Sequence, residues 1–180
     1  APLFGRRRSD GPQEYDRAAA SVSVLIAAHN EEQVIDRRLR NLAECQLPEG
    51  CEILLGCDGC GDRTVEIARR WERSPARMKC HGAAGEDRLA GLHVFDFQPQ
   101  RGKPAVLKDL FERSTGEILV FSDANTDFAA DAVDRMLTEI SADCIGGVSG
   151  KLELLDAGST TKENVYWKLE NWLKQKESDV

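Results

Sequence analysis

The polar residues that could carry chemistry follow short apolar runs of the chain. One run reads ILVFSDANT and ends at Asp123 and Asn125, and another ends at Asp58. The segment QRGKP adds two cations, Arg101 and Lys103. Carboxylates, an amide oxygen and cations around one crevice suit a phosphorylated ligand that arrives with a divalent ion, for which hard oxygen ligands favour Mg²⁺ or Mn²⁺. A plain turn explains Asp and Asn at a strand end equally well.

Alternating strands and amphipathic helices would position these residues. Continuous apolar runs predict strands, and apolar residues three and four positions apart predict helices. We expect strands at 22–28, 52–57, 92–97 and 117–122, and helices that begin at Asn30, Thr64 and Gly102 and near Val133. This βαβα order predicts an α/β fold with a mostly parallel sheet and helices on both faces. Ligands of such sheets bind at the carboxyl ends of the strands.

Two of the predicted helices carry more specific expectations. Asn30 is placed as the N-cap of the first helix, with Gln33 completing a capping box. The helix after Gly102 has Pro104 in its first turn, where proline is tolerated. Its apolar positions predict a buried face made of Val106, Leu107, Leu110 and Phe111.

The two ends of the chain differ from this regular pattern. Residues 1–20 contain an Arg6-Arg7-Arg8 triplet and little apolar periodicity, which predicts a flexible lead-in or a juxtamembrane linker. We expect the folded domain to span 21–180. Within it, 144–155 predicts at least one more strand, and 162–176 predicts an amphipathic helix.

Composition excludes several classes of protein. The length of 180 residues and 41% hydrophobic content predict one domain with a real core. The formal net charge of -7 argues against a general nucleic-acid binder, which needs a basic face. No apolar stretch approaches the roughly 20 residues of a membrane span.

The six cysteines are expected to be reduced thiols, because a chain of this size does not need disulfides to fold. Cys57 and Cys60 form a CxxC, which is typical of half a zinc site or of a redox pair. A second CxxC is absent, and Cys80-His81 is too tightly spaced to complete a four-ligand site.

Several motifs of phosphate-binding and hydrolytic enzymes are absent from the sequence, which reduces the number of enzyme classes to consider. The sequence has no Walker-type GxxxxGK[ST] loop and no GxGxxG after its first strand. It also lacks the GxSxG of an α/β-hydrolase. A transferase that uses a nucleotide phosphate remains as the favoured class.

Four segments in order carry a family resemblance that covers about 22–178. They are VLIAAHNEEQVI, GCDGCGDRT, QRGKPAVLKD and GEILVFSDANT. In these segments the chain resembles the inverting family 2 glycosyltransferases of the GT-A fold. It is similar especially to the cellulose, chitin and poly-N-acetylglucosamine synthase-like branch, which builds extracellular polysaccharides.

The resemblance implies a pocket for a nucleotide sugar. Its residues would be Ala28, His29, Glu31, Asp58, Lys103 and Asp123. Asp58 would contact the base, and Lys103 would lie near the base or the diphosphate. Asp123 and Asn125 would hold a divalent metal, Mn²⁺ or Mg²⁺. Because Asn125 stands where the family has a second acid, we expect weaker metal affinity, or a metal that arrives with the nucleotide sugar.

The resemblance also implies an activity. We expect inverting transfer from a nucleoside-diphosphate sugar, a UDP-sugar, to a growing glycan or a lipid-linked acceptor in bacterial envelope or extracellular polysaccharide synthesis. The chain would be a cytoplasmic domain of an inner-membrane protein, meeting the membrane through segments outside it. No general base is identified, and Glu170 and Glu177 are interpreted as solvated acids, so the acceptor part is expected to be missing.

Two alternatives stay open on the sequence alone. A nucleotidyltransferase shares the α/β sheet and the carboxylate-metal chemistry, but it would carry a Gly-rich basic loop after the first strand, where this chain reads AAHNE. The other alternative is a non-catalytic nucleotide- or metal-binding module in which Cys57 and Cys60 form a zinc or redox site.

Overall fold

The structure is a computed structural model that describes residues 21–73, 80–81, 87–88, 91–140 and 145–151. Contacts within the chain divide it into two units, Ala1–Gly147 and Val148–Val180, and every helix and strand below belongs to the first.

Some predictions fall outside the described residues. They concern the lead-in at 1–20, the helix at 162–176, and the acids Glu170 and Glu177. The strand predicted within 144–155 is wrong for the part that is described, because 145–151 forms no strand. Among the described helices, none combines the length and the apolar character that a membrane span requires.

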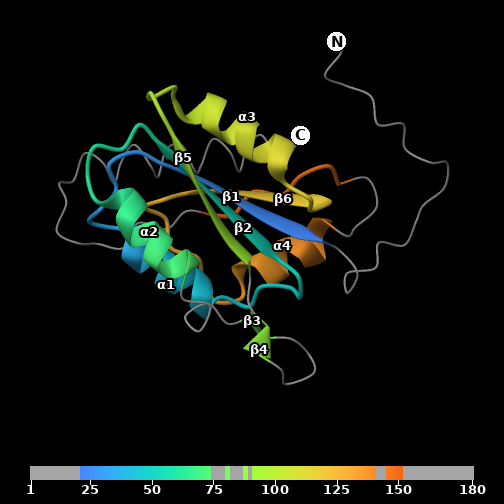
Figure 1. The fold of residues 1–180 in the computed structure, drawn as a ribbon. Helices are drawn as coiled ribbons and strands as arrows, with labels where there is room; N and C mark the ends of the chain where they lie inside the picture. The colour runs from blue at the N-terminus through green and yellow to red at the C-terminus, as the bar shows by residue number, and fades with distance from the viewer. Residues whose placement is uncertain (1–20, 74–79, 82–86, 89–90, 141–144, 152–180) are drawn as a thin grey trace, which may run out of the picture. The chain divides into compact units, whose positions relative to one another are not determined.

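Four parallel strands form the central sheet (Figure 1). They are β1 (Val22–Ala28), β2 (Glu52–Asp58), β5 (Gly91–Phe97) and β6 (Ile118–Asp123). Their order is β5-β2-β1-β6, with every pairing parallel. The chain therefore builds the sheet outward from β1 on one side and then crosses to the other side for β6. The strand order thus reverses between β1 and β6, and ligands of such sheets bind at the carboxyl ends of the strands next to the reversal.

Helices cover both faces of the sheet, as predicted (Figure 1). One face packs against α1 (Ile35–Glu44), α2 (Thr64–Glu72) and α4 (Ala132–Ile140), and the other against α3 (Lys103–Arg113). Strand β1 is buried on both sides, since Val24 and Ile26 face the first group and Leu25 faces α3. A continuous apolar run is the pattern that such a doubly covered strand requires.

Gly56 sets the distance between α3 and the sheet. A Cβ added at this position would lie 2.4 Å from Val106 Cγ1 and 3.1 Å from Phe97. Only glycine therefore permits the observed contact between β2 and the buried face of α3.

Three local predictions differ from the structure. Helix α1 begins at Ile35, and Asn30 has a positive φ of 54° instead of capping it, so the predicted capping box is wrong. The Asn30 side chain accepts a hydrogen bond from the Gly61 amide, 2.9 Å away. Phe111 is 51% exposed rather than on the buried face of α3, whereas Val106 and Leu110 are buried.

A short antiparallel pair was not predicted from the sequence. It consists of β3 (Cys80–His81) and β4 (Asp87–Arg88), which lie between α2 and β5 in the chain. Strands of two residues have no hydrophobic alternation, so their pattern carries too little information to be recognised.

Glu52 joins three segments at the amino end of the sheet. Its carboxylate accepts hydrogen bonds from the Ser23 hydroxyl at 2.5 Å and from the Thr115 amide at 2.6 Å. Partial burial acts to raise the pKa of Glu52, but the hydrogen bonds from Ser23, Thr115 and Gly116 outweigh it and lower the pKa below 4.5. A lowered carboxyl pKa in the folded state means that ionised Glu52 stabilises the fold.

We predict that Glu52→Gln lowers the free energy of unfolding by about 1 kcal/mol at pH 7, because a neutral amide replaces the charged acceptor. The folded-state pKa is the lower one, so the contribution is present above the unfolded pKa and is lost as pH falls through the folded value. The difference between variant and wild type should therefore shrink as the pH falls below 4.5. Urea unfolding at several pH values measures it, with exposed Glu117→Gln as the control; a pH-independent difference would contradict the assignment.

Candidate functional site

The predicted site residues gather at the carboxyl edge of the sheet. Ala28 ends β1, Asp58 ends β2 and Asp123 ends β6, while Lys103 begins α3. The strand register places Ala27 of β1 beside Asp123, so the β1 and β6 ends are level at the reversal of strand order. The sequence prediction that these strand-end loops converge is therefore confirmed for the ends of β1, β2 and β6.

Asp58 fixes the loop that leads into α3. This side chain is 3% exposed, and its two oxygens accept hydrogen bonds from the Arg101 and Gly102 amides, both at 2.7 Å. Next to it, the Gly59 amide donates to the Phe97 carbonyl at 2.8 Å. The carboxylate of Asp58 is thus used to hold the start of α3, and its predicted contact with a base stays a prediction.

Gly59 and Gly102 permit this tight connection. Both have positive φ values, 60° and 89°, and a Cβ on Gly59 would lie 2.6 Å from the Gln100 backbone nitrogen. The Arg101 side chain turns to Asp109 at 2.8 Å and stacks on the Phe97 ring. Of the two cations predicted for the crevice, Arg101 is therefore engaged elsewhere, and Lys103 is the one directed to the strand ends.

His29 and Asn30 connect the loops after β1 and β2. His29 Nδ1 lies 2.5 Å from the Asp58 carbonyl oxygen, and His29 Nε2 lies 3.1 Å from the Asn30 amide nitrogen. A carbonyl can only accept, so Nδ1 carries the proton and Nε2 accepts from Asn30. His29 remains exposed at the end of β1, whereas the Ala28 side chain is buried and offers a ligand little more than its backbone.

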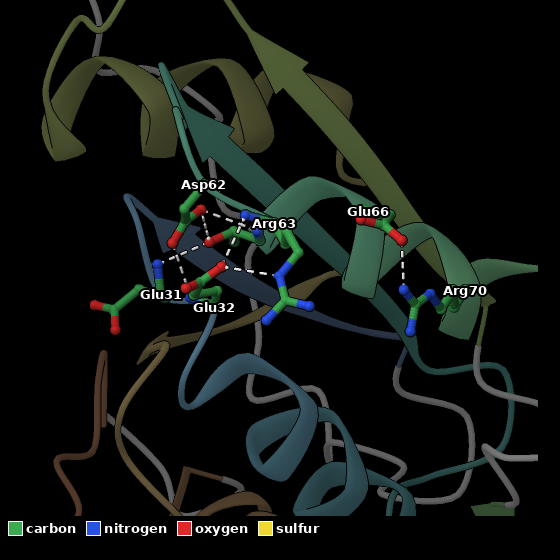
Figure 2. A network of polar contacts seen from close by, with 7 residues as sticks. Glu31, Glu32, Asp62, Arg63, Glu66 and Arg70 are labelled. Carbon is green, nitrogen blue, oxygen red and sulfur yellow. Dashed lines mark hydrogen bonds and ion pairs between the residues drawn. The ribbon is translucent and has the colours of Figure 1, made fainter.

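A second network, shown in Figure 2, joins the β1–α1 loop to the start of α2. Asp62 accepts hydrogen bonds from the Thr64 amide at 2.9 Å, the Thr64 hydroxyl at 2.5 Å and the Glu32 amide at 3.0 Å. The Glu31 amide donates to the Thr64 hydroxyl oxygen at 2.8 Å, and Glu32 pairs with Arg63 at 3.2 Å. Slight burial opposes the change, but these hydrogen bonds lower the pKa of Asp62.

Within this network, the Glu31 carboxylate stays free to contact a ligand. Figure 2 shows the Glu31 carboxylate directed away from the contacts of its neighbours, and it makes no hydrogen bond or ion pair within the described part of the chain. The sequence prediction included Glu31 but missed Asp62 and Thr64, which set its backbone. The sequence does contain a signal for this contact, because an Asp whose side chain accepts from the amide two residues on is typical of an Asx-turn.

Lys103 and Asp123 form an ion pair at the ends of α3 and β6. Both side chains are 53% exposed, so a ligand can reach them and the pair adds little stability. Asn125 is exposed on the turn that follows Asp123. Its backbone carbonyl accepts a hydrogen bond from Arg37 at 3.5 Å.

Two hard oxygen donors are therefore available for a cation, on Asp123 and Asn125. Over the described ranges, no group of three or more His, Cys, Asp or Glu side chains could hold a metal ion. Mg²⁺ and related ions commonly take one or two protein oxygens and complete their coordination with water and substrate phosphates. Asp123 and Asn125 match that number of protein oxygens.

The CxxC has structural contacts. Cys57 is buried in β2, and burial, with smaller contributions from Cys60 and Asp96, raises its pKa to about 12. The Cys60 thiol donates to the Ala28 carbonyl at 3.6 Å. Because the thiolate is the form that reacts, a pKa of about 12 disfavours a redox role for Cys57. Cys45, Cys51, Cys57 and Cys60 are all free thiols.

The fold is an α/β domain with a parallel sheet, and the site residues lie at the carboxyl ends of strands next to the reversal of strand order. Residues 23–178 match the family model of glycosyl transferase family 2. The chain belongs to this family.

Two curated relatives illustrate the similarity. Glycosyltransferase AglD of Haloferax volcanii is 33% identical over 132 residues, which are 71% of this chain and 19% of AglD. Beta-monoglucosyldiacylglycerol synthase of Trichormus variabilis is 26% identical over 166 residues, which are 86% of this chain and 31% of that protein. The chain thus spans less than a third of the length of either relative.

Solved structures share the fold. The mannosyltransferase PcManGT from Pyrobaculum calidifontis, in complex with GDP-Man and Mn²⁺, has a TM-score of 0.60 at 24% identity and covers 69% of this chain and 33% of its own. TarS 1-349 of S. aureus, in complex with UDP-GlcNAc, has a TM-score of 0.53 at 16% identity and covers 74% of this chain and 38% of its own. The predicted GT-A fold, with its mostly parallel sheet, is confirmed.

Proposed function

We propose that this chain is the donor-binding part of an inverting glycosyltransferase that uses a UDP-sugar. The observation that carries the proposal is the Lys103–Asp123 pair at the reversal of strand order. An exposed acid beside an exposed cation at this point matches the needs of a diphosphate, which binds a cation directly and a carboxylate through a metal.

Different residues of the chain would bind different parts of the donor. Glu31 and His29 lie after β1, where they would contact the nucleoside, and Lys103 would contact the diphosphate. Asp123 and Asn125 would hold Mn²⁺ or Mg²⁺, which supplies Lewis-acid stabilisation of the negative charge on the departing diphosphate. Asp58 would act by fixing the loop that carries Lys103.

The names of the relatives support a nucleotide-sugar donor without defining the sugar or its acceptor. The TarS structure contains UDP-GlcNAc, PcManGT contains GDP-Man, and one relative is named as a synthase of a glucosylated lipid. We propose a glycan or lipid-linked acceptor, as in the polysaccharide synthase branch that the motifs resemble. The same resemblance and the Arg6-Arg7-Arg8 triplet support a cytoplasmic domain of an inner-membrane protein.

The test is calorimetric titration of the chain with UDP, GDP and ADP, each with and without Mn²⁺. We predict that UDP binds most tightly and that Mn²⁺ strengthens UDP binding at least about tenfold, which is about 1.4 kcal/mol. Tighter binding of GDP than of UDP would indicate that the donor is a GDP-sugar and would contradict the proposed UDP-sugar. No binding of any nucleotide, with or without Mn²⁺, would contradict a donor site in this chain.

A further inference from the structure

Arg38 is a fully buried cation beneath the end of β6. It lies on α1 with 0% of its surface exposed, and its guanidinium sits 4.2 Å from the centre of the Phe128 ring. Nη2 donates to the Ser122 hydroxyl at 2.7 Å and Nη1 donates to the Asn41 side-chain oxygen at 2.7 Å. Its Nε has no hydrogen-bond partner among the described residues.

This burial is costly, because both hydrogen-bond acceptors of Arg38 are neutral. Burial lowers the pKa of Arg38 to about 10, while Cys45, Asp127 and Asp123 act in the opposite direction, so it stays protonated at neutral pH. A buried ion without a direct counter-ion is destabilising, and apolar side chains of similar volume often stabilise a fold more. Packing alone therefore does not explain a guanidinium here.

The contacts of Arg38 lead to both ends of the turn that contains Asp123 and Asn125. Ser122 immediately precedes the turn. At the far end, Asn41 holds Phe128 twice: its side-chain oxygen accepts from the Phe128 amide at 2.8 Å, and its nitrogen donates to the Phe128 carbonyl at 2.9 Å. The exposed turn is thus fixed at both ends by one buried group, directly and through Asn41.

We propose that Arg38 is a positioning residue that, with Asn41, holds the 122–128 segment in the geometry that donor and metal binding require. The inference rests on the proposed function of Asp123 and Asn125. Arg38 does not touch the ligand; it acts through Ser122 and Phe128. Its role explains why a charged side chain occupies a position where an apolar one would pack at lower cost.

The test compares Arg38→Met and Arg38→Lys with Arg40→Met, a control on the same helix whose side chain is exposed and pairs with Asp36. Without ligand, we expect Arg38→Met to speed hydrogen exchange of the 123–128 amides about tenfold while the amides of β1 and β2 stay unchanged. Arg38→Lys should restore most of the protection, since it keeps a buried cationic donor, and Arg40→Met should change nothing.

A second measurement separates positioning from a purely structural role. Arg38→Met should reduce the Mn²⁺-dependent gain in UDP affinity while UDP binding without metal stays within about threefold of wild type. Equal exchange in Arg38→Met and Arg40→Met, or faster exchange across the whole sheet, would overturn the proposal, as would an equal loss of UDP affinity with and without metal.

Two results would require a different measurement: a variant that does not fold, and a wild type that binds UDP without a Mn²⁺ effect. If Arg38→Met does not fold, Ser122→Ala removes one acceptor of the guanidinium and should show the same local increase in exchange; wild-type exchange in Ser122→Ala would overturn the proposal. If wild type shows no Mn²⁺-dependent UDP binding, the proposed metal site fails, and the exchange measurements without ligand still decide whether Arg38 holds the segment.

Discussion

Asp58→Asn is expected to lower the free energy of unfolding by about 3 kcal/mol, because one charge-assisted hydrogen bond is lost and a backbone amide is left without its acceptor. The Asn side chain keeps the volume but can accept from only one of the Arg101 and Gly102 amides, and its NH₂ group then faces the other donor. Urea unfolding of the variant measures the loss.

The same variant should weaken UDP binding at least about tenfold, with or without Mn²⁺, since Lys103 follows the released loop directly. The matched control is Asp109→Asn. Asp109 also contacts Arg101, but it accepts a hydrogen bond from the Arg101 side chain and not from the Arg101 backbone amide. We expect only a small change in stability and binding for the control. If both variants behave alike, the hydrogen bonds of Asp58 to the loop backbone are not what positions Lys103.

The two central strands, β1 and β2, could be predicted from the sequence because they are buried on both faces. Strand β1 is a continuous apolar run, and each strand is followed by residues that favour turns or helix starts. The positions of Asp58 and Asp123 at strand ends follow from those runs alone. Their clustering then follows from the parallel sheet, since its strand ends meet at one edge.

The errors arise where a tertiary contact overrides a local preference. Asn is a preferred N-cap residue, but the Asn30 side chain accepts a hydrogen bond from the Gly61 amide, 31 positions away in the sequence. Phe111 continues the apolar stripe of α3, yet that helix is the only described one on its face, and Phe111 remains exposed. The backbone contacts of Asp58 span 43 and 44 positions, which no local pattern encodes.

Arg38 shows a pattern that sequence inspection can use. It stands three positions after Ile35, and Leu39 and Leu42 complete the buried stripe of α1. A charged residue on the apolar face of a helix predicts either a poorly packed helix or a buried charge that has a functional role. The structure supports the second interpretation, because the guanidinium contacts Ser122 next to the predicted metal-binding turn.

Asp123→Asn is expected to abolish the Mn²⁺-dependent gain in UDP affinity and to leave the fold intact. The amide loses the charge that a divalent ion requires, and Asn125 already supplies a neutral oxygen, so two neutral donors would remain. The exposed ion pair contributes little to stability, so the unfolding transition should not move measurably. Calorimetric titration of UDP with and without Mn²⁺ measures the effect.

The ion pair makes the metal-free measurement as informative as the metal-dependent one. Asp123→Asn frees the Lys103 ammonium from its carboxylate, so UDP binding without metal should stay equal or rise up to about threefold. Asp127→Asn is the matched control, because it changes the net charge equally in an exposed acid that pairs with Arg37. It should retain the Mn²⁺-dependent gain. A gain that persists in Asp123→Asn, or disappears equally in Asp127→Asn, would show that Mn²⁺ acts by general charge or elsewhere in the chain.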